Sequence, residues 1–288
     1  MAIDLHVHSI CSDGTVPPGE LPALARSAGL TALALTDHDT TDGIKDFLAQ
    51  QENFPEIELI AGVELSSRIG AREIHIVGLF IDPENDYLQS VMHNMRQERI
   101  IRARAMQEKL STLGYEVTDD DLRATGMQED VPGRPHFAQV LVRKYNFPDT
   151  KSVFEQLLKQ GAAGFVPRNL PPPEEVIKAV KAAGGAAVWA HPFHSRRSEN
   201  NFVARTIREL KPAGLDGLEV YYSEYNETKT ATALRMAKEY NLACSGGSDF
   251  HGTVHPQTHL GCGKGNLAVP DEILDNLRKA TMPKVVLV

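Results

Sequence analysis

Cysteine is scarce in this 288-residue sequence, where Cys11, Cys244 and Cys262 lie far apart and form no C-x-x-C pair. This spacing gives no sign of a disulfide scaffold or a thiolate zinc site, and we expect three small hydrophobic side chains in a reducing compartment. Long apolar runs are also absent, and the N-terminus has neither a basic region nor a long apolar stretch. We therefore expect a soluble, cytoplasmic protein with no membrane partner.

Positive charge is in the minority. The sequence has 30 Lys and Arg residues against 38 Asp and Glu residues, so its formal net charge is -8. No overall positive field would attract long nucleic acid or an anionic membrane, although local cations could hold a small anionic substrate. Hydrophobic residues make up 42% and charged residues 24%, which excludes disordered and collagen-like chains. The length of 288 residues predicts one large domain or a domain with an insertion.

Short β-rich runs alternate with helical patterns through much of the chain. Helices are expected at Glu20–Ala28, which Gly29 ends, and at Glu174–Ala183, while Thr40 or Thr41 could cap another. This alternation predicts an α/β fold with βα units around a parallel sheet, either open or closed into a barrel. The expected strands are Ile3–Val7, Thr31–Leu35, Glu58–Val63, Glu73–Phe80, Ala186–Ala190, Gly217–Tyr221, Leu242–Ser245 and Lys284–Val288.

The middle of the chain interrupts the alternation. From about residue 85 to residue 165 the segments are charged and helix-like, and none resembles a strand. We expect residues 1–100 and 166–288 to form the catalytic α/β body. Residues 101–165 would then be a helical insertion that acts as a lid over the substrate.

Six of the eleven histidines lie at or just past expected strand ends, close to carboxylates. The first strand ends in His6-Val7-His8, where the two-residue period of a strand puts both imidazoles on one face, as a chelate requires. Burying so many titratable groups at one end of a sheet would be costly unless metal ions compensated them. Nitrogen and oxygen donors without thiolate favour Mn²⁺, Fe²⁺ or Zn²⁺ over Mg²⁺ or Ca²⁺. The candidate ligands are His6, His8, Asp13, His38, Glu64, His75, His191, Asp249 and His251.

These segments resemble the motif series of the polymerase-and-histidinol-phosphatase (PHP) family, over roughly residues 1–100 and 166–288. The resemblance implies a distorted (βα)7-type barrel with three divalent metal ions, for which Mn²⁺ is the first candidate and Fe²⁺ or Zn²⁺ the alternatives. The segments that carry it are His6-x-His8 with Asp13, Thr36-Asp37-His38, Glu64, His75, Ala190-His191-Pro192 and Ser248-Asp249-x-His251. The ligand sets it implies are His6, His8, Glu64 and Asp249 for one ion, Glu64, His75 and His191 for a second, and Asp13, His38 and His251 for a third.

The insertion is similar to one branch of that family, which contains 3',5'-nucleoside bisphosphate phosphatases and 5'-to-3' exoribonucleases. The similar segments are Arg99–Arg104 with Met106 and Leu110, and Gly133-Arg134-Pro135-His136. The resemblance implies a phosphatase that removes the 3'-phosphate of nucleoside 3',5'-bisphosphates, for example converting pAp to AMP and phosphate. A metal-bridging hydroxide would attack the phosphorus in line, so that Asp13 and Glu64 act in catalysis through the ions they hold.

A bisphosphate substrate carries a second dianion that needs a fixed cation, and the forked guanidinium of arginine suits it. Arg134, between Gly133 and Pro135, is the first candidate for binding the 5'-phosphate. Further candidates are Arg99, Arg102, Arg168 and Arg196.

Other polar and aromatic residues near the ligand motifs have candidate roles. His194, three residues after His191, could protonate the leaving oxygen or bind a phosphate oxygen. Asp37 and Asp39 are expected to orient imidazoles rather than to bind metal. The aromatic residues that could stack on a base or simply pack in the core are Phe193, Tyr221, Tyr222 and Phe250.

Three alternatives to the phosphatase stay open at this point. An exoribonuclease could use the same centre on short 5'-phosphorylated RNA, although the net charge of -8 and the single Trp favour a small substrate. A non-catalytic PHP module would keep the metals for stability alone. Histidinol phosphate is a further possible substrate, which the nucleotide-branch insertion disfavours. No protein partner can be identified from the sequence.

Overall fold

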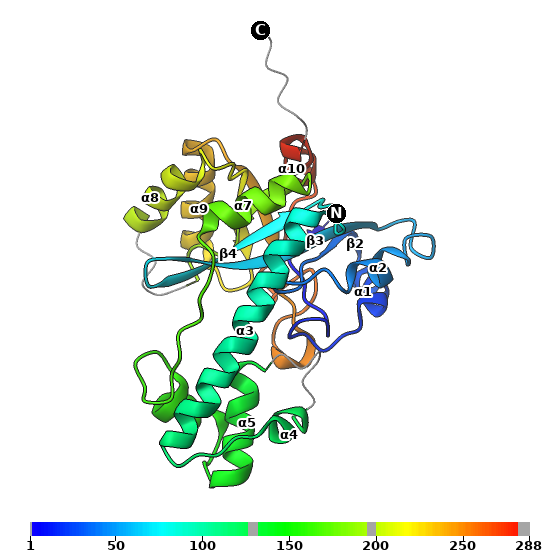
Figure 1. The fold of residues 1–288 in the computed structure, drawn as a ribbon. Helices are drawn as coiled ribbons and strands as arrows, with labels where there is room; N and C mark the ends of the chain where they lie inside the picture. Colours follow the sequence, from blue (N-terminus) through cyan, green and yellow to red (C-terminus); the bar gives the residue numbers. More distant parts are fainter. Residues whose placement is uncertain (1, 126–131, 195–199, 282–288) are drawn as a thin grey trace. The chain divides into compact units, whose positions relative to one another are not determined.

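Figure 1 shows the fold in a computed structural model, which describes residues 2–125, 132–194 and 200–281. The chain divides into two compact units, one formed by Met1–Met92 with Pro171–Val288 and the other by His93–Leu170. The first unit contains the sheet, and the second is helical in its described part. No helix among the described residues is long and apolar enough to cross a lipid bilayer.

Seven strands form one sheet in which each strand pairs with the next along the chain. Beyond the first strand, the amide of Leu5 donates to the carbonyl of Gly246 at 3.1 Å, and that of His8 donates to Phe250 at 2.9 Å. These bonds join the two ends of the sheet into a nearly closed barrel, which confirms the predicted α/β barrel architecture. The expected strand Lys284–Val288 lies outside the described residues. The strands are β1 Ala2–Asp4, β2 Leu30–Leu35, β3 Glu58–Ile69, β4 Arg72–Leu79, β5 Ala186–Trp189, β6 Gly217–Tyr222 and β7 Ala243–Gly247.

The sheet is mixed, whereas the strand–helix alternation predicted a parallel one. Strands β3 and β4 are antiparallel because only Gly70 and Ala71 separate them, and a tight hairpin reverses the chain direction. Gly70 has φ of +58°, a left-handed conformation that glycine adopts without steric cost. Strands β4 and β5 are also antiparallel, and the other four pairs are parallel.

The two helices of the first unit whose bounds were predicted lie close to their expected positions. Helix α1 ends just before Gly29, which has φ of +72°, and α7 begins with Pro173, a residue suited to a first helical position. The prediction of a threonine cap is wrong, because Gly43 precedes α2 while the hydroxyl of Thr40 instead accepts from the amide of Asp42. The helices are α1 Leu21–Ser27, α2 Ile44–Leu48, α7 Pro173–Ala182, α8 Asn200–Leu210, α9 Glu227–Glu239 and α10 Glu272–Thr281, with 3-10 turns at Pro18–Glu20 and Gly252–Val254.

Strand β2 is buried on both of its faces. Ala32 and Ala34 belong to one hydrophobic cluster, whereas Leu33 and Leu35 belong to another that includes Phe47 of α2. Strands covered on both sides have continuous apolar sequences, as the run LTALAL has. In Figure 1, α1 and α2 lie together beside β2 and β3. The polar side chains of this segment therefore begin only after the carboxyl end of β2, at Thr36.

The helical unit has its own core. Met106 and Leu110 of the long helix α3 pack with Phe137 and Leu141 of α5 and with Leu158. At the start of α4 the hydroxyl of Thr118 accepts from the amide of Asp121 at 3.2 Å, and the Asp121 carboxylate accepts in return. The helices are α3 Asp86–Thr112, which begins in the first unit and continues into this one, α4 Asp119–Arg123, α5 Arg134–Tyr145 and α6 Thr150–Val153, followed by a π turn at Phe154–Leu158.

We predict that Gly247→Ala lowers the free energy of unfolding by about 1–3 kcal/mol, the cost of overpacking a core. A methyl group there would overlap the backbone and Cβ of His6 and lie 2.9 Å from Asp4 Oδ1, where β7 meets the first strand. Urea unfolding measures the change. Gly19→Ala is the matched control, because a methyl group at Gly19 meets only ordinary contacts. Equal stability of the two variants would contradict the close approach.

We predict that the free energy of unfolding decreases as pH falls from about 7.5 to about 5.5, and that protonation of His136 in the unfolded chain contributes to this loss. Burial lowers the pKa of this imidazole below 6.5, and its Nδ1 accepts from the amide of Gly133 at 2.9 Å. The unfolded chain then binds more protons than the folded chain, so stability present above pH 6.5 is lost on acidification. His136→Gln keeps an acceptor and should lose less stability over this range in urea unfolding, whereas His93→Gln, at an exposed site, should follow the wild type.

Candidate metal centre

His6 and His8 follow β1, and their imidazoles lie on one side because Val7 between them packs into the opposite core. The two side chains are 1% and 0% exposed. Asp249, just past β7, places its Oδ1 atom 3.5 Å from Nε2 of His6 and 3.1 Å from Nε2 of His8. Barrel closure thus brings residues from both ends of the chain into one cluster.

Glu64, in the middle of β3, lies at the centre of this cluster and is fully buried. Its Oε1 atom lies 2.9 Å from Nδ1 of His75 on β4 and 3.0 Å from Nε2 of His191 after β5. Its Oε2 atom lies 2.9 Å from Nδ1 of His38, which follows β2, and 3.3 Å from Nε2 of His6. One carboxylate therefore touches imidazoles from four different parts of the barrel.

Asp13 is the most exposed residue of the cluster and contacts the buried His251. Asp13 Oδ1 lies 3.2 Å from Nε2 of His251, and its Oδ2 lies 3.9 Å from Nε2 of His38. The donor atoms that converge within 4.8 Å of one another form three groups. These groups are His6, His8 and Glu64; His38, Glu64 and His75; and His8, Asp13, His38 and His251.

The structure brings all nine predicted ligands together, but several ring nitrogens and one carboxylate oxygen at their centre form no hydrogen bond of suitable geometry among the described residues, even where they lie close together, as His38 Nδ1 and Glu64 Oε2 do at 2.9 Å. The buried atoms without such a bond are Nε2 of His6, both ring nitrogens of His8, Nδ1 of His38 and Oε2 of Glu64. An unsatisfied buried polar atom costs about 1–3 kcal/mol, so several facing one another would be unfavourable alone. Lone pairs that converge in this way, on nitrogen and oxygen donors, fit divalent cations such as Mn²⁺, Fe²⁺ or Zn²⁺.

Charges within the cluster shift pKa values in opposite directions. Burial disfavours the charged form of Glu64, but the surrounding imidazoles, that of His38 foremost, hold its pKa well below 4.5. Burial likewise opposes a charge on His75, yet Glu64 raises its pKa to about 10. Protons and metal ions would compete for the same ring nitrogens, so metal binding at this site releases protons.

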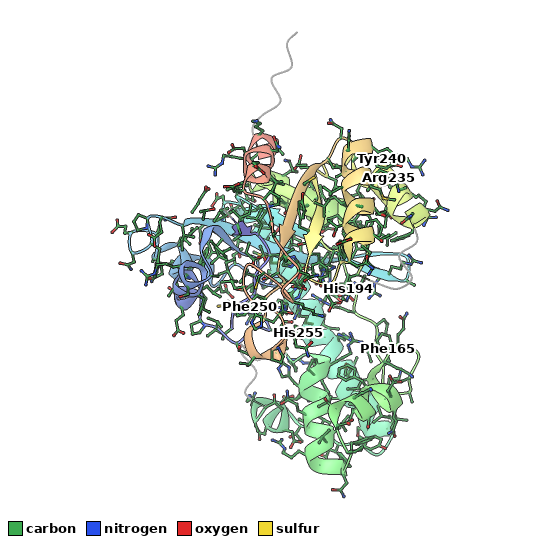
Figure 2. The ribbon with its side chains drawn as sticks, turned by 180° about the vertical axis from the view of Figure 1, so that it is seen from behind. Phe165, His194, Arg235, Tyr240, Phe250 and His255 are labelled. Atoms are coloured by element: carbon green, nitrogen blue, oxygen red, sulfur yellow. The ribbon has the colours of Figure 1, made fainter. Side chains whose placement is uncertain are left out.

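The cluster opens into a cavity of about 530 Å³, a size typical of small-molecule sites. His194 and His255, labelled in Figure 2, line it from the loops after β5 and β7. The His194 side chain is half-exposed, and its Nδ1 lies 3.1 Å from Oε2 of Glu224. Tyr222 also lines the cavity and donates from its hydroxyl to Asp249 Oδ2 at 2.9 Å. By contrast, Phe193, Tyr221 and Phe250 are buried or pack against the hydrophobic clusters.

Residues 4–165, more than half of the chain, match the sequence model of the PHP domain family. The chain belongs to the PHP family. It is 35% identical to a 5'-3' exoribonuclease of Haemophilus influenzae over 86% of this chain and 89% of that protein. It is 33% identical to a 3',5'-nucleoside bisphosphate phosphatase of Chromobacterium violaceum over 86% of this chain and 87% of that protein.

Structural similarity agrees with this assignment. The crystal structure of a protein assigned as a metal-dependent phosphoesterase from Bifidobacterium adolescentis superposes with a TM-score of 0.81. The two chains are 29% identical, and the match covers 98% of this chain and 97% of the other. The PHP fold, the family and the cluster of metal-binding side chains together make this chain a metal-binding phosphoester hydrolase.

Sequence reasoning missed Glu219, a buried carboxylate on β6 behind the PHP centre. Its Oε1 lies 3.0 Å from Nδ1 of His6, and its Oε2 accepts from the main-chain amide of His191 at 2.6 Å. His191 has φ of +32°, a strained conformation for a residue with a side chain, and this amide bond helps to hold it. The available signal was an acidic residue inside the apolar run GLEVYY.

The aspartates expected to orient imidazoles have other partners. Asp37 accepts from the amide of Ser9 at 2.7 Å and from the hydroxyl of Ser12, so it orders the loop that carries Asp13. Asp39 accepts from the amide of Ser66 at 2.7 Å. The orienting contact predicted for Asp37 is therefore wrong, and Glu219 makes it instead.

The predicted phosphate-binding arginines belong to the helical unit, apart from Arg196, which lies outside the described residues. Arg134 begins α5, and its guanidinium carbon lies 5.9 Å from the ring centres of both Phe154 and Phe165. Arg102 donates to the carbonyl of Val166 at 2.9 Å. Arg99 lies on α3 and Arg168 is 9% exposed. The contact of these arginines with a substrate stays a prediction.

We predict that Glu219→Gln weakens metal binding about 10- to 100-fold, as expected when a carboxylate behind a histidine ligand is lost. The amide keeps the size of the side chain but removes the charge beside Nδ1 of His6. Competition with a chelator gives the affinity, and elemental analysis gives the number of ions retained. Glu227→Gln, at an exposed site on α9, is the control. Unchanged affinity in Glu219→Gln would show that the carboxylate does not support the ligand.

Proposed function

We propose that this chain is a phosphatase that removes the 3'-phosphate from nucleoside 3',5'-bisphosphates, with three divalent ions, Mn²⁺ first among them, at the nine clustered residues. The observation that carries the proposal is the set of buried donor atoms of His6, His8, His38 and Glu64 that form no hydrogen bond, next to a cavity of small-molecule size that His38 and Glu64 line. The relative named as a bisphosphate phosphatase supports the choice of substrate. The three cysteines form no disulfide, which is consistent with a cytoplasmic enzyme.

The ions, when bound, supply an activated water and neutralise charge on the phosphate that is transferred. The chain itself contributes orientation. Glu219 fixes the ring of His6 and the backbone of His191, while the Tyr222 hydroxyl fixes one oxygen of Asp249 and leaves the other toward His8. His194, on the cavity wall, can donate a proton or a hydrogen bond to a phosphate or leaving oxygen.

A second candidate is a 5'-to-3' exoribonuclease, which would cut the same 3' P–O bond in a 5'-phosphorylated RNA. The Haemophilus influenzae relative of that name supports it, with coverage similar to that of the phosphatase. The net charge of -8 favours the smaller substrate, because strand binding depends on a basic surface.

We predict that the Mn²⁺-loaded protein converts adenosine 3',5'-bisphosphate to 5'-AMP and one equivalent of phosphate. Chromatography of the nucleotides with a phosphate assay measures both products. His191→Ala should lower kcat by at least about 100-fold, because it removes a donor from the centre. Elemental analysis and urea unfolding of the same variant separate a lost ion from a lost fold.

The same protein given 5'-phosphorylated and 5'-hydroxyl oligoribonucleotides separates the two candidates. Survival of the bisphosphate together with stepwise release of mononucleotides from the 5'-phosphorylated strand would overturn the phosphatase in favour of the exoribonuclease. Equal activity of His191→Ala and wild type would overturn the proposed centre itself.

A further inference from the structure

The wall of the cavity next to the metal centre carries a cluster of three charged or titratable side chains from three loops. Glu224, after β6, accepts a hydrogen bond from the Lys264 ammonium through Oε1, and its Oε2 lies 3.1 Å from Nδ1 of His194. All three side chains line the cavity and are 39–51% exposed, so a ligand can reach them.

The three loops are tied together by contacts that do not depend on these charges. The amide of Phe193 donates to the Tyr225 hydroxyl at 2.8 Å, which joins the His194 loop to the Glu224 loop. The Asn266 side chain donates to the carbonyls of Ser223 and Tyr225 at 3.3 Å and 3.2 Å, which joins the Lys264 loop to the same place. Lys264 is therefore held at the cavity by the backbone around it.

Gly263, next to Lys264, allows the Lys264 loop to pack closely against Ser223 in the Glu224 loop. Gly263 has φ of +57°, and a methyl group there would lie 2.7 Å from the Cβ atom of Ser223, closer than two such carbons approach. Its amide and carbonyl form a bridge with His259 at 2.8 Å and 2.7 Å, which closes the turn that presents Lys264. Such a turn limits the conformations of the lysine backbone before any ligand arrives.

Lys264 differs in charge from the carboxylates that line the same cavity. The residues that line the cavity include the carboxylates Asp13, Glu64, Asp249 and Glu224, and Lys264 is the one lysine or arginine among those the structure describes. Its ammonium group has three N–H donors, and one bond to Glu224 leaves two for another acceptor. Glu224 in turn has its negative charge offset by Lys264, which reduces its repulsion of a phosphate nearby.

We propose that Lys264 binds the 5'-phosphate of the substrate, and that Glu224 is a positioning residue that holds Lys264 and His194 at the cavity wall. This inference rests on the proposed function, since it assigns the second phosphate of a bisphosphate substrate. It places a cation for that phosphate on the barrel unit itself.

The experiment compares kinetics and binding in the Mn²⁺-loaded full-length protein. Lys264→Met should raise KM for adenosine 3',5'-bisphosphate about tenfold or more, the loss expected for one charge-assisted hydrogen bond, with little change in kcat. Its kcat/KM for adenosine 3'-monophosphate, which lacks the 5'-phosphate, should stay at the wild-type value. Lys264→Arg should restore most of the affinity because it keeps the cation. Lys238→Met, at an exposed site on α9 outside the cavity lining, is the matched control.

Calorimetric binding of 5'-AMP and of adenosine makes the test independent of turnover. Lys264→Met should weaken 5'-AMP binding about tenfold and leave adenosine binding unchanged, and Glu224→Gln should weaken 5'-AMP binding less. If the wild type does not hydrolyse the bisphosphate but Lys264→Met still weakens 5'-AMP binding, the proposed substrate fails and the phosphate site stands. If the bisphosphate is hydrolysed with equal KM by wild type and Lys264→Met, or if 5'-AMP affinity does not change, the phosphate site is overturned.

Discussion

The buried carboxylate of Glu64 is the constraint on which the rest of the barrel unit depends. It contacts imidazoles that follow or belong to β1, β2, β4 and β5. These four strands must therefore place a histidine side chain next to the same carboxylate. A carboxylate without exposure to water is tolerated only where positive charge compensates it. The arrangement of four strand ends and the metal-binding chemistry therefore depend on one buried carboxylate.

The requirement to place side chains in this centre also explains two of the strained backbone positions among the described residues. His191 and Asp249 both have positive φ values, and each is fixed by a main-chain bond to a neighbouring part of the centre, from His191 to the carboxylate of Glu219 and from Asp249 to the carbonyl of His6. Backbone conformations of this kind persist where surrounding contacts over-determine them. Here the contacts are those that bring the side chains to their donor positions.

Local sequence patterns predicted most of the strands and the nine clustered residues, because strand periodicity and strand-end histidines are visible over a few residues. The antiparallel course of β4 was missed, since the Gly70-Ala71 turn is a weaker signal than the surrounding strand–helix alternation. Glu219 and Lys264 were missed for another reason. Their roles depend on partners such as His6 and Glu224 that are distant in sequence, and only the folded chain brings them together.

The β3–β4 hairpin has a consequence for the order in which the centre can assemble. Glu64 and His75 belong to one hairpin with a two-residue turn, so they can meet as soon as that segment has been synthesised. Asp249 and His251 lie near the other end of the chain and join His6 and His8 only when β7 docks. The centre is therefore incomplete until β7 has docked, however early the hairpin forms.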